Sequence, residues 1–400
     1  MQDVPGVRHV WNTQRDNVIA PSCTSVGYTG DFICKYCGTI DTDRPGTLIE
    51  RTGHDWDEGV ITLEPTNTTK GRILYTCETC GATKVEIFDS EPNVTRIMGN
   101  DRFRTSLAAA DELKAALGVT KFDTIVIASG TGFPDALAGS YLAAQKKAPV
   151  ILAANGSEGS VMTLVTDYVK ENLADGGTIY VLGGNGAVPA TFEEKMGTGY
   201  KIKRLAGSDR FETNILILKE AGVYGDEILV CTGKDFADSL SASATGAPIL
   251  LVPNKALTDT QKNYLATIKE GTKLYIIGGE GAVRASIEDE LKAYGSVFRI
   301  AGADRFATSV EIAKAFFKKP GNIVFAYAAN YPDGLSGGPL ALAKGAPLIL
   351  TQNAAKKIPI ATEYVENNTK ALRDVYVLGG PSLISDDTVN TILGIEDKKN

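Results

Sequence analysis

The chain has 400 residues, of which 43% are hydrophobic and 22% charged, as is typical of soluble globular proteins. This length suits two to four domains better than a single hydrophobic core. The formal net charge of −7 argues against nucleic-acid binding, which usually accompanies an excess of basic residues. The longest apolar runs are far shorter than the roughly 20 residues that span a bilayer, so we expect no membrane insertion.

The first residues, MQDVPGVRHVW, have neither the basic nor the apolar segment of an export signal. Either the protein is not exported, or its export signal lies outside this sequence. Five of the six cysteines lie within the first 80 residues. The sixth, Cys231, lies in the apolar run EILVCTG, which predicts a buried core position. This uneven distribution indicates that the first part of the chain is a different kind of domain.

Residues 1–90 contain two short repeats, each with an H-x-W motif and a C-x-x-C-G motif. In a C-x-x-C-G turn two thiolates can bind one tetrahedral metal ion, and the glycine permits the tight backbone. A region this short and this poor in apolar residues needs a metal or disulfides to be stable. We therefore predict a small β-rich, zinc-ribbon-like region with structural zinc. The candidate ligands are His9, Cys23, Cys34, Cys37, His54, Cys77 and Cys80.

Several ligand sets are compatible with this spacing. We favour one zinc per repeat, because H-x-W opens both repeats. Cys23 then belongs to the first site, and Asn67 occupies the corresponding place in the second site, which is incomplete. A variant assigns His54 to the first site, and a further alternative joins the two C-x-x-C-G turns in one four-cysteine site that leaves Cys23 free. Disulfide bonds are the remaining alternative if the protein works outside the cell.

The rest of the chain consists of three copies of one sequence pattern. The copies begin at Arg96, Arg204 and Arg299, so their starts are 108 and 95 residues apart. The four signatures, in order, are RIMGNDRFRTS, RLAGSDRFETN and RIAGADRFATS; GFPDALAGS, DFADSLSAS and NYPDGLSGG; APVIL, APILL and APLIL; and IYVLGG, LYIIGG and VYVLGG. Because this spacing is that of a domain, we place the copies at residues 94–200, 201–296 and 297–400.

Within a copy, short apolar strands alternate with helices. The strands are continuously apolar, as in parallel strands that are covered on both faces. In the first copy we expect strands at 95–99, 124–129, 149–154 and 178–184 and helices at 102–117, 134–145, 161–173 and 191–196. Small residues after Pro134 permit a close approach of that helix to the sheet. Each copy is therefore predicted to be a small doubly wound α/β unit with a parallel sheet.

The four signatures together resemble the cell-wall-binding repeat 2 family, which occurs in tandem threes on clostridial surface-layer and cell-wall proteins. The resemblance extends over about 305 residues. It implies three modules around a pseudo-threefold axis, which bind an anionic, teichoic-like wall polysaccharide without a covalent link. Over about 80 residues, the first part of the chain resembles Cys- and His-containing repeats of large surface proteins of gut Firmicutes, which implies a spacer or adhesive module.

Each copy offers two arginines, whose planar guanidinium groups suit bidentate contact with phosphate. Three equivalent clusters would bind a repeating polymer by avidity. The second arginine of each pair follows an Asp placed to cap a helix, so a structural salt bridge at a seam between modules is the alternative. The candidate polymer-binding residues are Arg96, Arg102, Arg204, Arg210, Arg299 and Arg305.

Other repeated residues have structural explanations. The aspartate of the second signature has no His or second carboxylate at matched spacing, so we expect it to cap a helix rather than to act in catalysis. The Gly-Gly pairs do not fit G-x-G-x-x-G and are expected to form turns. The aspartates in question are Asp135, Asp238 and Asp333. The phenylalanines expected in the core are Phe103, Phe211 and Phe306.

The leading hypothesis is a non-catalytic, secreted surface protein that is held on a Gram-positive wall, with other surface-layer proteins open as partners. The alternative is the anchoring part of an amidase or protease whose catalytic domain lies outside these 400 residues, because both histidines belong to the Cys/His repeats. A cytosolic α/β enzyme that binds a phosphorylated small molecule would instead show one distinctive copy among the three.

Overall fold

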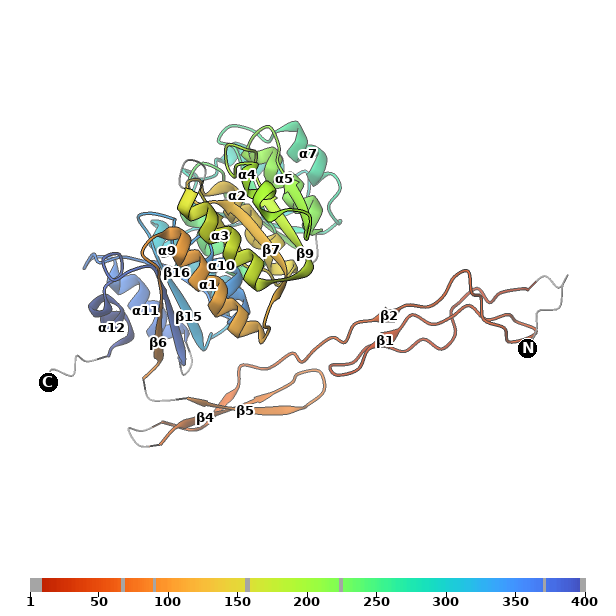
Figure 1. Cartoon of the computed structure of the whole chain (residues 1–400). Helices are drawn as coiled ribbons and strands as arrows, with labels where there is room; N and C mark the ends of the chain where they lie inside the picture. Colours follow the sequence, from red (N-terminus) through yellow and green to blue (C-terminus); the bar gives the residue numbers. More distant parts are fainter. Residues whose placement is uncertain are drawn as a thin grey trace. The chain divides into compact units, whose positions relative to one another are not determined.

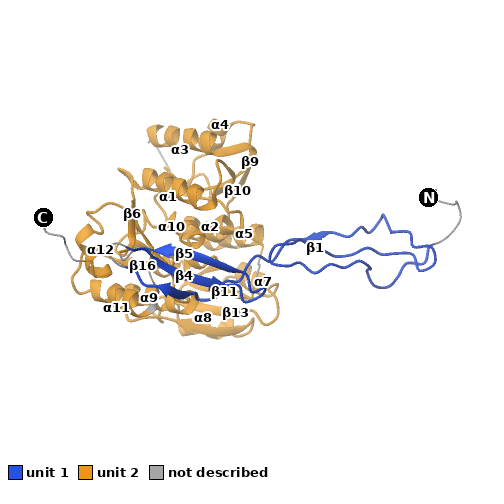
Figure 2. Cartoon of the chain, turned by 90° about the horizontal axis from the view of Figure 1, so that it is seen from below, with its two compact units in different colours: residues 1–90 blue, residues 91–400 orange. Residues whose placement is uncertain are grey.

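The computed structural model of the chain shows two compact units, Met1–Ser90 and Glu91–Asn400 (Figure 2). The residues that it describes are 9–65, 69–88, 91–154, 159–222, 226–369 and 372–395. None of the helices in these ranges is long and apolar enough to cross a membrane. Asn67, expected in the place of a cysteine ligand, lies outside the described residues.

The first unit is built from short antiparallel strands, as predicted. They are β1 (Gly27–Tyr28), β2 (Leu48–Ile49), β3 (Val60–Leu63), β4 (Gly71–Thr76) and β5 (Thr83–Phe88). β1 pairs with β2, and the other three form a sheet in the order β3-β4-β5. The buried apolar side chains described in this unit are Cys23, Cys34, Ile73, Cys77 and Phe88. Three of these five are cysteines, so packing alone supplies little stability.

Three four-stranded parallel sheets form the centre of the second unit (Figure 1). Their strands are β6 (Asn93–Ile97), β7 (Phe122–Ser129), β8 (Val150–Ala153), β9 (Leu173–Leu182), β10 (Lys201–Leu205), β11 (Glu227–Thr232), β12 (Ile249–Val252), β13 (Lys273–Ile277), β14 (Ser296–Ile300), β15 (Asn322–Tyr327), β16 (Leu348–Thr351) and β17 (Asp374–Leu378). The sheet orders are β8-β7-β9-β10, β12-β11-β13-β14 and β16-β15-β17-β6. The central strands are buried along most of their length, as the continuous apolar runs predicted.

The first strand of each repeat does not belong to the sheet of its own copy. β10, which opens the second copy, pairs with β9 of the first, and β14 pairs with β13. β6, which opens the first copy, pairs with β17 of the last, so the brown β6 lies among the blue strands in Figure 1. The boundaries predicted at residues 200 and 296 therefore separate the fourth strand of a sheet from the other three. Each sheet thus contains one strand of the next copy, and the three copies are linked in a closed ring.

Helices cover both faces of each sheet. They are α1 (Arg102–Leu117), α2 (Pro134–Gln145), α3 (Gly159–Asn172), α4 (Thr191–Met196), α5 (Arg210–Ala221), α6 (Ala237–Ala242), the 3₁₀ helix η1 (Ser243–Thr245), α7 (Asp259–Leu265), α8 (Ala285–Leu291), α9 (Arg305–Phe316), α10 (Gly337–Ala343), α11 (Ile358–Asn368) and α12 (Asp386–Leu393). The chain runs from β7 outward to β8 and then back across β7 to β9. Because right-handed crossovers in opposite directions lie on opposite faces, α2 and α3 cover opposite faces. The predicted doubly wound α/β class is confirmed.

Successive copies pack through their first two helices. The second helix of each copy contacts the first helix of the next: α2 contacts α5, α6 contacts α9, and α10 contacts α1. Small residues permit the tight packing of α2, because a Cβ on Gly139 would lie 2.2 Å from Leu182 Cδ1 of β9. These three cyclic contacts, with the closed ring of strands, give the pseudo-threefold arrangement.

The first helix of each copy begins at a capping aspartate, as predicted. Asp209 Oδ1 accepts hydrogen bonds from the backbone N–H groups of Phe211 and Glu212, both 2.8 Å long. Asp304 caps α9 in the same way, and Asp101 caps α1 by accepting one hydrogen bond, from the backbone N–H of Arg104. Each cap also fixes the position of the arginine that follows it. The expected core phenylalanines pack as predicted, with Phe103 and Phe306 buried and Phe211 partly buried against the core.

Candidate functional site

Each sheet carries a pocket at the carboxyl ends of its strands. The three pockets have volumes of about 450, 350 and 470 Å³ and are lined by equivalent residues. Open α/β sheets bind ligands at this edge, next to the point where the strand order reverses. The first pocket combines Asp135 and Gly183 of the first copy with Asp209 and Arg210 of the second. Each pocket is thus composite, since two neighbouring copies supply its walls.

The pocket lined by the third and first copies closes the ring. It combines Asp333 and Gly380, near the end of the chain, with Asp101 and Arg102. The remaining pocket places Asp238 opposite Arg305 in the same way. The second arginine and the second-signature aspartate, about 30 residues apart within a copy, therefore meet only across a seam.

The second-signature aspartate does not cap its helix, contrary to prediction. In the first copy α2 begins after Phe133, and no side chain caps it. The side chain of Asp135 lies instead against the glycine turn that follows β9. A Cβ on Gly183 would lie 2.4 Å from Asp135 Oδ2, and the φ angle of Gly183 is +86°. The Gly-Gly pairs are turns, as predicted, and their first glycine makes room for a carboxyl group.

Burial shifts the pKa of the pocket carboxyl groups upward. Burial raises the pKa of Asp135, and the guanidinium of Arg210 opposes this increase. Burial and the neighbouring Asp235 raise the pKa of Asp238 to about 6, against the effect of Arg305. Burial therefore favours the neutral form of these carboxyl groups more than it would for exposed aspartates.

The first arginine of each copy is engaged inside the fold. Arg204 donates from Nε and Nη2 to the carboxylate of Glu193, at 3.1 and 3.0 Å, and from Nη1 to the Gly183 carbonyl at 2.8 Å. The side chain of Arg204 is 18% exposed. The equivalent ion pairs are Arg299–Glu288 and Arg96–Asp386. Each of these arginines ties the fourth strand to the last helix of the preceding copy and holds the glycine turn beside the pocket.

The second arginine is held by a single backbone carbonyl of its own copy. The Nη1 atoms of Arg102, Arg210 and Arg305 donate to the carbonyl oxygens of Gly130, Gly233 and Ala328, at 2.8, 2.7 and 2.8 Å. Within the described part of the chain, Arg102 and Arg210 form no ion pair. Arg305 pairs with Asp235 of the preceding copy at 3.1 Å. The predicted seam salt bridge is therefore present at one seam.

Three aromatic rings gather where the copies meet. Phe133, Phe236 and Tyr331 each precede the second-signature aspartate by two residues, and their ring centroids lie 5.4 to 6.3 Å apart. The guanidinium carbons of Arg210 and Arg305 lie 5.7 and 5.2 Å from the Phe133 and Phe236 centroids. Such pairs stabilise a cation over a ring face. The sequence analysis missed this cluster, although an aromatic residue at the same place in all three copies could have indicated it.

Three segments of the chain, residues 96–193, 204–288 and 299–389, match the profile described as Cell wall binding domain 2 (CWB2). Together they cover more than half of the chain. The chain belongs to the cell wall binding domain 2 family. The resemblance noted from the sequence is confirmed, and the three repeats are CWB2 modules.

Two proteins of Bacillus subtilis (strain 168) are similar to the CWB2 part of the chain. One, named Amidase enhancer, is 27% identical over 304 residues, which is 74% of this chain and 40% of that protein. The other, named N-acetylmuramoyl-L-alanine amidase LytC, is 27% identical over 269 residues, which is 66% of this chain and 51% of that protein. The chain thus spans about half the length of these relatives or less.

Two solved structures from Clostridium difficile share the fold. Cwp8 superposes with a TM-score of 0.66 at 21% identity, over 86% of this chain and 63% of that one. Cwp6 superposes with a TM-score of 0.66 at 18% identity, over 92% of this chain and 57% of that one. At these identities the likeness establishes the fold of the CWB2 modules and not their ligand.

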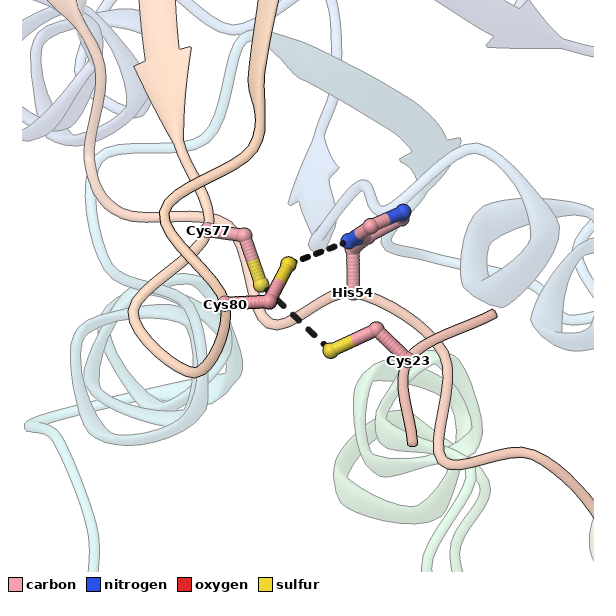
Figure 3. Close-up of side chains that lie close together, drawn as sticks. All are labelled: Cys23, His54, Cys77 and Cys80. Atoms are coloured by element: carbon pink, nitrogen blue, oxygen red, sulfur yellow. Dashed lines mark hydrogen bonds between the residues drawn. The ribbon is translucent and has the colours of Figure 1, made fainter. Parts of the chain in front are cut away.

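The Cys and His residues of the first unit form two clusters outside the CWB2 segments, and all seven candidate ligands take part. One cluster consists of His9, Cys34 and Cys37; the other consists of Cys23, His54, Cys77 and Cys80. Figure 3 shows the four side chains of the second cluster pointing toward one another. The ligand atoms of each cluster lie within 4.8 Å of one another. The favoured assignment of Cys23 to the first repeat was wrong, because Cys23 lies with the C-x-x-C-G turn of the second.

The two C-x-x-C-G turns have the same backbone hydrogen bonds. The N–H of Gly38 donates to the Cys34 carbonyl at 3.0 Å, and that of Gly81 donates to the Cys77 carbonyl at 2.8 Å. Both glycines have positive φ, at +74° and +73°, which favours glycine there. In each repeat the H-x-W tryptophan packs against the histidine ring, with centroids 4.9 and 4.7 Å apart. The packed rings hold each histidine toward its cysteine turn.

The distances in the second cluster suit one metal ion. Cys23 Sγ and Cys77 Sγ lie 3.8 Å apart, and Cys80 Sγ and His54 Nδ1 lie 3.3 Å apart. Two thiolates on a tetrahedral zinc, with Zn–S bonds of about 2.3 Å, are about 3.8 Å apart, whereas a disulfide needs about 2.05 Å. Cys37 Sγ and His9 Nδ1 in the first cluster also lie 3.3 Å apart. Both clusters could therefore hold a metal.

One thiol in each cluster has thiolate character. Burial would raise the pKa of Cys77, but hydrogen bonds from the Cys80 backbone and the His54 side chain outweigh it and lower the pKa to about 6. The backbone N–H of Tyr36 is the main cause that lowers the pKa of Cys34 to about 6. Since the thiolate is the form that binds metals, both turns are prepared as ligands.

Proposed function

We propose that this protein is held non-covalently on a Gram-positive cell wall by an anionic wall polysaccharide, which binds in the three seam pockets. The observation that supports this most directly is the threefold repetition of one composite pocket, each with an arginine from the neighbouring copy. A polymer with regularly spaced charges can occupy several such pockets at once, so modest affinities combine into strong binding.

The pocket chemistry favours a sugar phosphate polymer over a simple anion. Each pocket offers a guanidinium at the start of a helix, where a phosphate is stabilised by both the arginine and the helix dipole. It also offers aspartate oxygens that accept hydrogen bonds from sugar hydroxyls. Of the six arginines expected to contact the polymer, we retain Arg102, Arg210 and Arg305 as direct contacts. We assign Arg96, Arg204 and Arg299 the role of holding the glycine turns.

Co-sedimentation with isolated walls tests this proposal. The purified chain should pellet with walls that carry the anionic polymer and stay in the supernatant with walls stripped of it. Binding should weaken as the salt concentration rises, because exposed charge pairs are screened beyond a Debye length of about 8 Å at physiological ionic strength. Equal pelleting with both wall preparations would overturn the proposal.

We further propose that the chain acts by binding alone and works outside the cell. Support comes from the matched relatives, whose similarity lies within 304 and 269 residues of longer proteins. These relatives are named as an amidase and an amidase enhancer. Their names favour a second possibility, in which the chain is the anchoring part of a wall-modifying enzyme. Assaying the chain for release of soluble wall fragments distinguishes these two possibilities, since a pure anchor releases none.

We also propose that the Cys/His clusters bind zinc as a structural ion. Zinc accepts tetrahedral sites of cysteine and histidine, and the folding of a unit with so few buried apolar side chains would gain from the binding energy. Metal analysis of the purified protein should find zinc. Its absence, together with thiols that no longer react, would favour disulfides instead.

A further inference from the structure

Cys23 is buried at the centre of an exposed loop. Its side chain is 5% exposed, whereas Ser22, Thr24 and Ser25 around it are exposed. The loop is a compact turn, because Ser22 Oγ accepts hydrogen bonds from the backbone N–H groups of Thr24 and Ser25, at 3.3 and 3.0 Å. The thiol is therefore held inward by the turn, away from solvent and away from the C-x-x-C-G turn of its own repeat.

The Cys23 thiol lies against the candidate ligands of the other repeat. Cys23 Sγ is 3.8 Å from Cys77 Sγ, and the side chains of Cys80 and His54 complete the cluster (Figure 3). Sulfur atoms at this separation are too far apart for a disulfide and at the distance that a shared tetrahedral ion requires, about 3.8 Å. Three ligands come from residues 54–80, and the fourth comes from a loop 31 residues before His54.

We propose that a single metal ion, bound by Cys23, His54, Cys77 and Cys80, links the two Cys/His repeats and sets how rigidly they are joined. This inference rests on the proposed binding of zinc and adds a ligand set and a mechanical role to it. The ion closes a loop of chain between Cys23 and His54, which removes conformational freedom from the connecting segment. Without the ion, the two repeats are joined by that segment and its few backbone hydrogen bonds.

The two clusters differ in their number of described ligands. The second has four protein ligands and forms a closed site, as structural zinc sites do. The first has three described ligands, His9, Cys34 and Cys37, and each cluster includes one exposed cysteine, Cys37 or Cys80. A site of three ligands leaves one position to water and binds more weakly. The chain is therefore expected to bind one divalent ion tightly and a second one loosely.

The Arg51–Thr52 peptide bond lies beside Cys23, so its access to a protease should depend on the bound ion. The N–H of Thr52 donates to the carbonyl of Ser22 at 2.9 Å, directly beside Cys23. The preceding residue, Arg51, is exposed and offers a trypsin site. When the ion holds Cys23 in place, this hydrogen bond keeps the Arg51–Thr52 bond out of a protease active site. Loss of the link should expose it.

The test uses the full chain with Cys23→Ser and, as a matched control, Cys34→Ser, which removes one buried thiolate from the other cluster. Reduced, metal-free protein is titrated with Co²⁺, whose thiolate charge-transfer absorption reports the cysteine ligands, and is then digested with trypsin. We expect Cys23→Ser to weaken the tight site at least tenfold and to accelerate cleavage at Arg51. Cys34→Ser should remove only the loose site and leave the cleavage rate unchanged.

Combining the variants gives a second readout. If Cys23 belongs with Cys77, the effects of Cys23→Ser and Cys77→Ser on the tight site should not add, whereas Cys34→Ser added to Cys23→Ser should not weaken the tight site further. Additive effects of the first pair, or a Cys23–Cys77 disulfide found by mass spectrometry in the protein as isolated, would overturn the link. If neither cluster binds metal, the zinc proposal fails as well. Binding to walls is measured separately and does not enter the result.

Discussion

Asn93 and Asp374 are 281 residues apart in the sequence but face each other in one parallel sheet, where Asn93 Nδ2 donates to Asp374 Oδ1 at 3.3 Å. They belong to β6 and β17, the strands that close the ring of three sheets. Because each fourth strand comes from the next copy, no single copy has a complete sheet of its own. The copies are therefore expected to depend on one another for stability, and the seam pockets exist only in the assembled ring.

Closure of the ring can be tested at Ile97 in β6, which is 3% exposed. Ile97→Ala should lower the free energy of unfolding of the second unit by about 2–4 kcal/mol, as for other buried Ile→Ala changes. The measurement is urea unfolding followed by circular dichroism. Val94→Ala, on the same strand but 39% exposed, is the control and should cost much less. Equal effects of the two variants would mean that β6 is not packed in the third sheet.

The ion pair of Arg204 and Glu193 should contribute to stability rather than to wall binding. Glu193→Gln removes the charge that Arg204 pairs with, and we expect a loss of about 1–3 kcal/mol in the free energy of unfolding. Glu194→Gln, at the exposed neighbouring position, should be nearly neutral. Wall binding of both variants, measured at a temperature where both are folded, should remain. Weaker wall binding by folded Glu193→Gln would show that the first arginines contact the polymer.

Asp238 should make stability depend on pH. Burial raises its pKa from 3.8 to about 6, so the folded chain keeps a proton that the unfolded chain has already lost between these values. Stability from this group is fully present below about pH 4 and is lost as pH rises through about 6, by an amount on the order of 3 kcal/mol. Asp238→Asn should lack this loss. Thermal unfolding from pH 4 to 7 tests it, with Glu280→Gln in the neighbouring exposed turn as control.

Removal of metal should affect only the first unit. A chelator should increase hydrogen exchange at the backbone of residues 9–88, because the energy of metal binding is part of the folding energy there. The exchange of the CWB2 modules should not change, since none of the described cysteine and histidine clusters lies in them. Increased exchange throughout residues 91–400 would show that the two units fold together, contrary to this prediction.

Much of the second unit could be predicted from the sequence, because local patterns determine it. The apolar runs gave the strands, and Asp101, Asp209 and Asp304 were recognised as helix caps from their position. That each sheet takes its fourth strand from the next copy could not be predicted in this way. A repeat has the same period wherever a copy is taken to begin, so the period does not show which strands share a sheet. The pairings of β10 with β9, β14 with β13 and β6 with β17 show where the sheets are divided.

The sites were less predictable, because they form between copies. The arginines were identified as a class, but the difference between Arg204, held by Glu193, and Arg210, which faces a neighbouring copy, depends on tertiary contacts. Cys23 was assigned to the nearest C-x-x-C-G turn in sequence, whereas the fold places it beside Cys77. In both cases the spacing within a repeat identified the residues that belong to a site, but it did not show which residues of another copy or repeat they contact.

The central claim, that the seam arginines bind the anionic wall polymer, is tested most directly by the triple variant Arg102→Gln/Arg210→Gln/Arg305→Gln. The control is Lys121→Gln/Lys219→Gln/Lys318→Gln, which removes the same charge from one exposed lysine in each copy, outside the pockets. Affinity for the purified polymer is measured by calorimetry at fixed salt. We predict that the arginine variant loses at least a hundredfold in affinity and that the lysine variant changes only a few-fold. Equal losses by the two folded variants would contradict the claim.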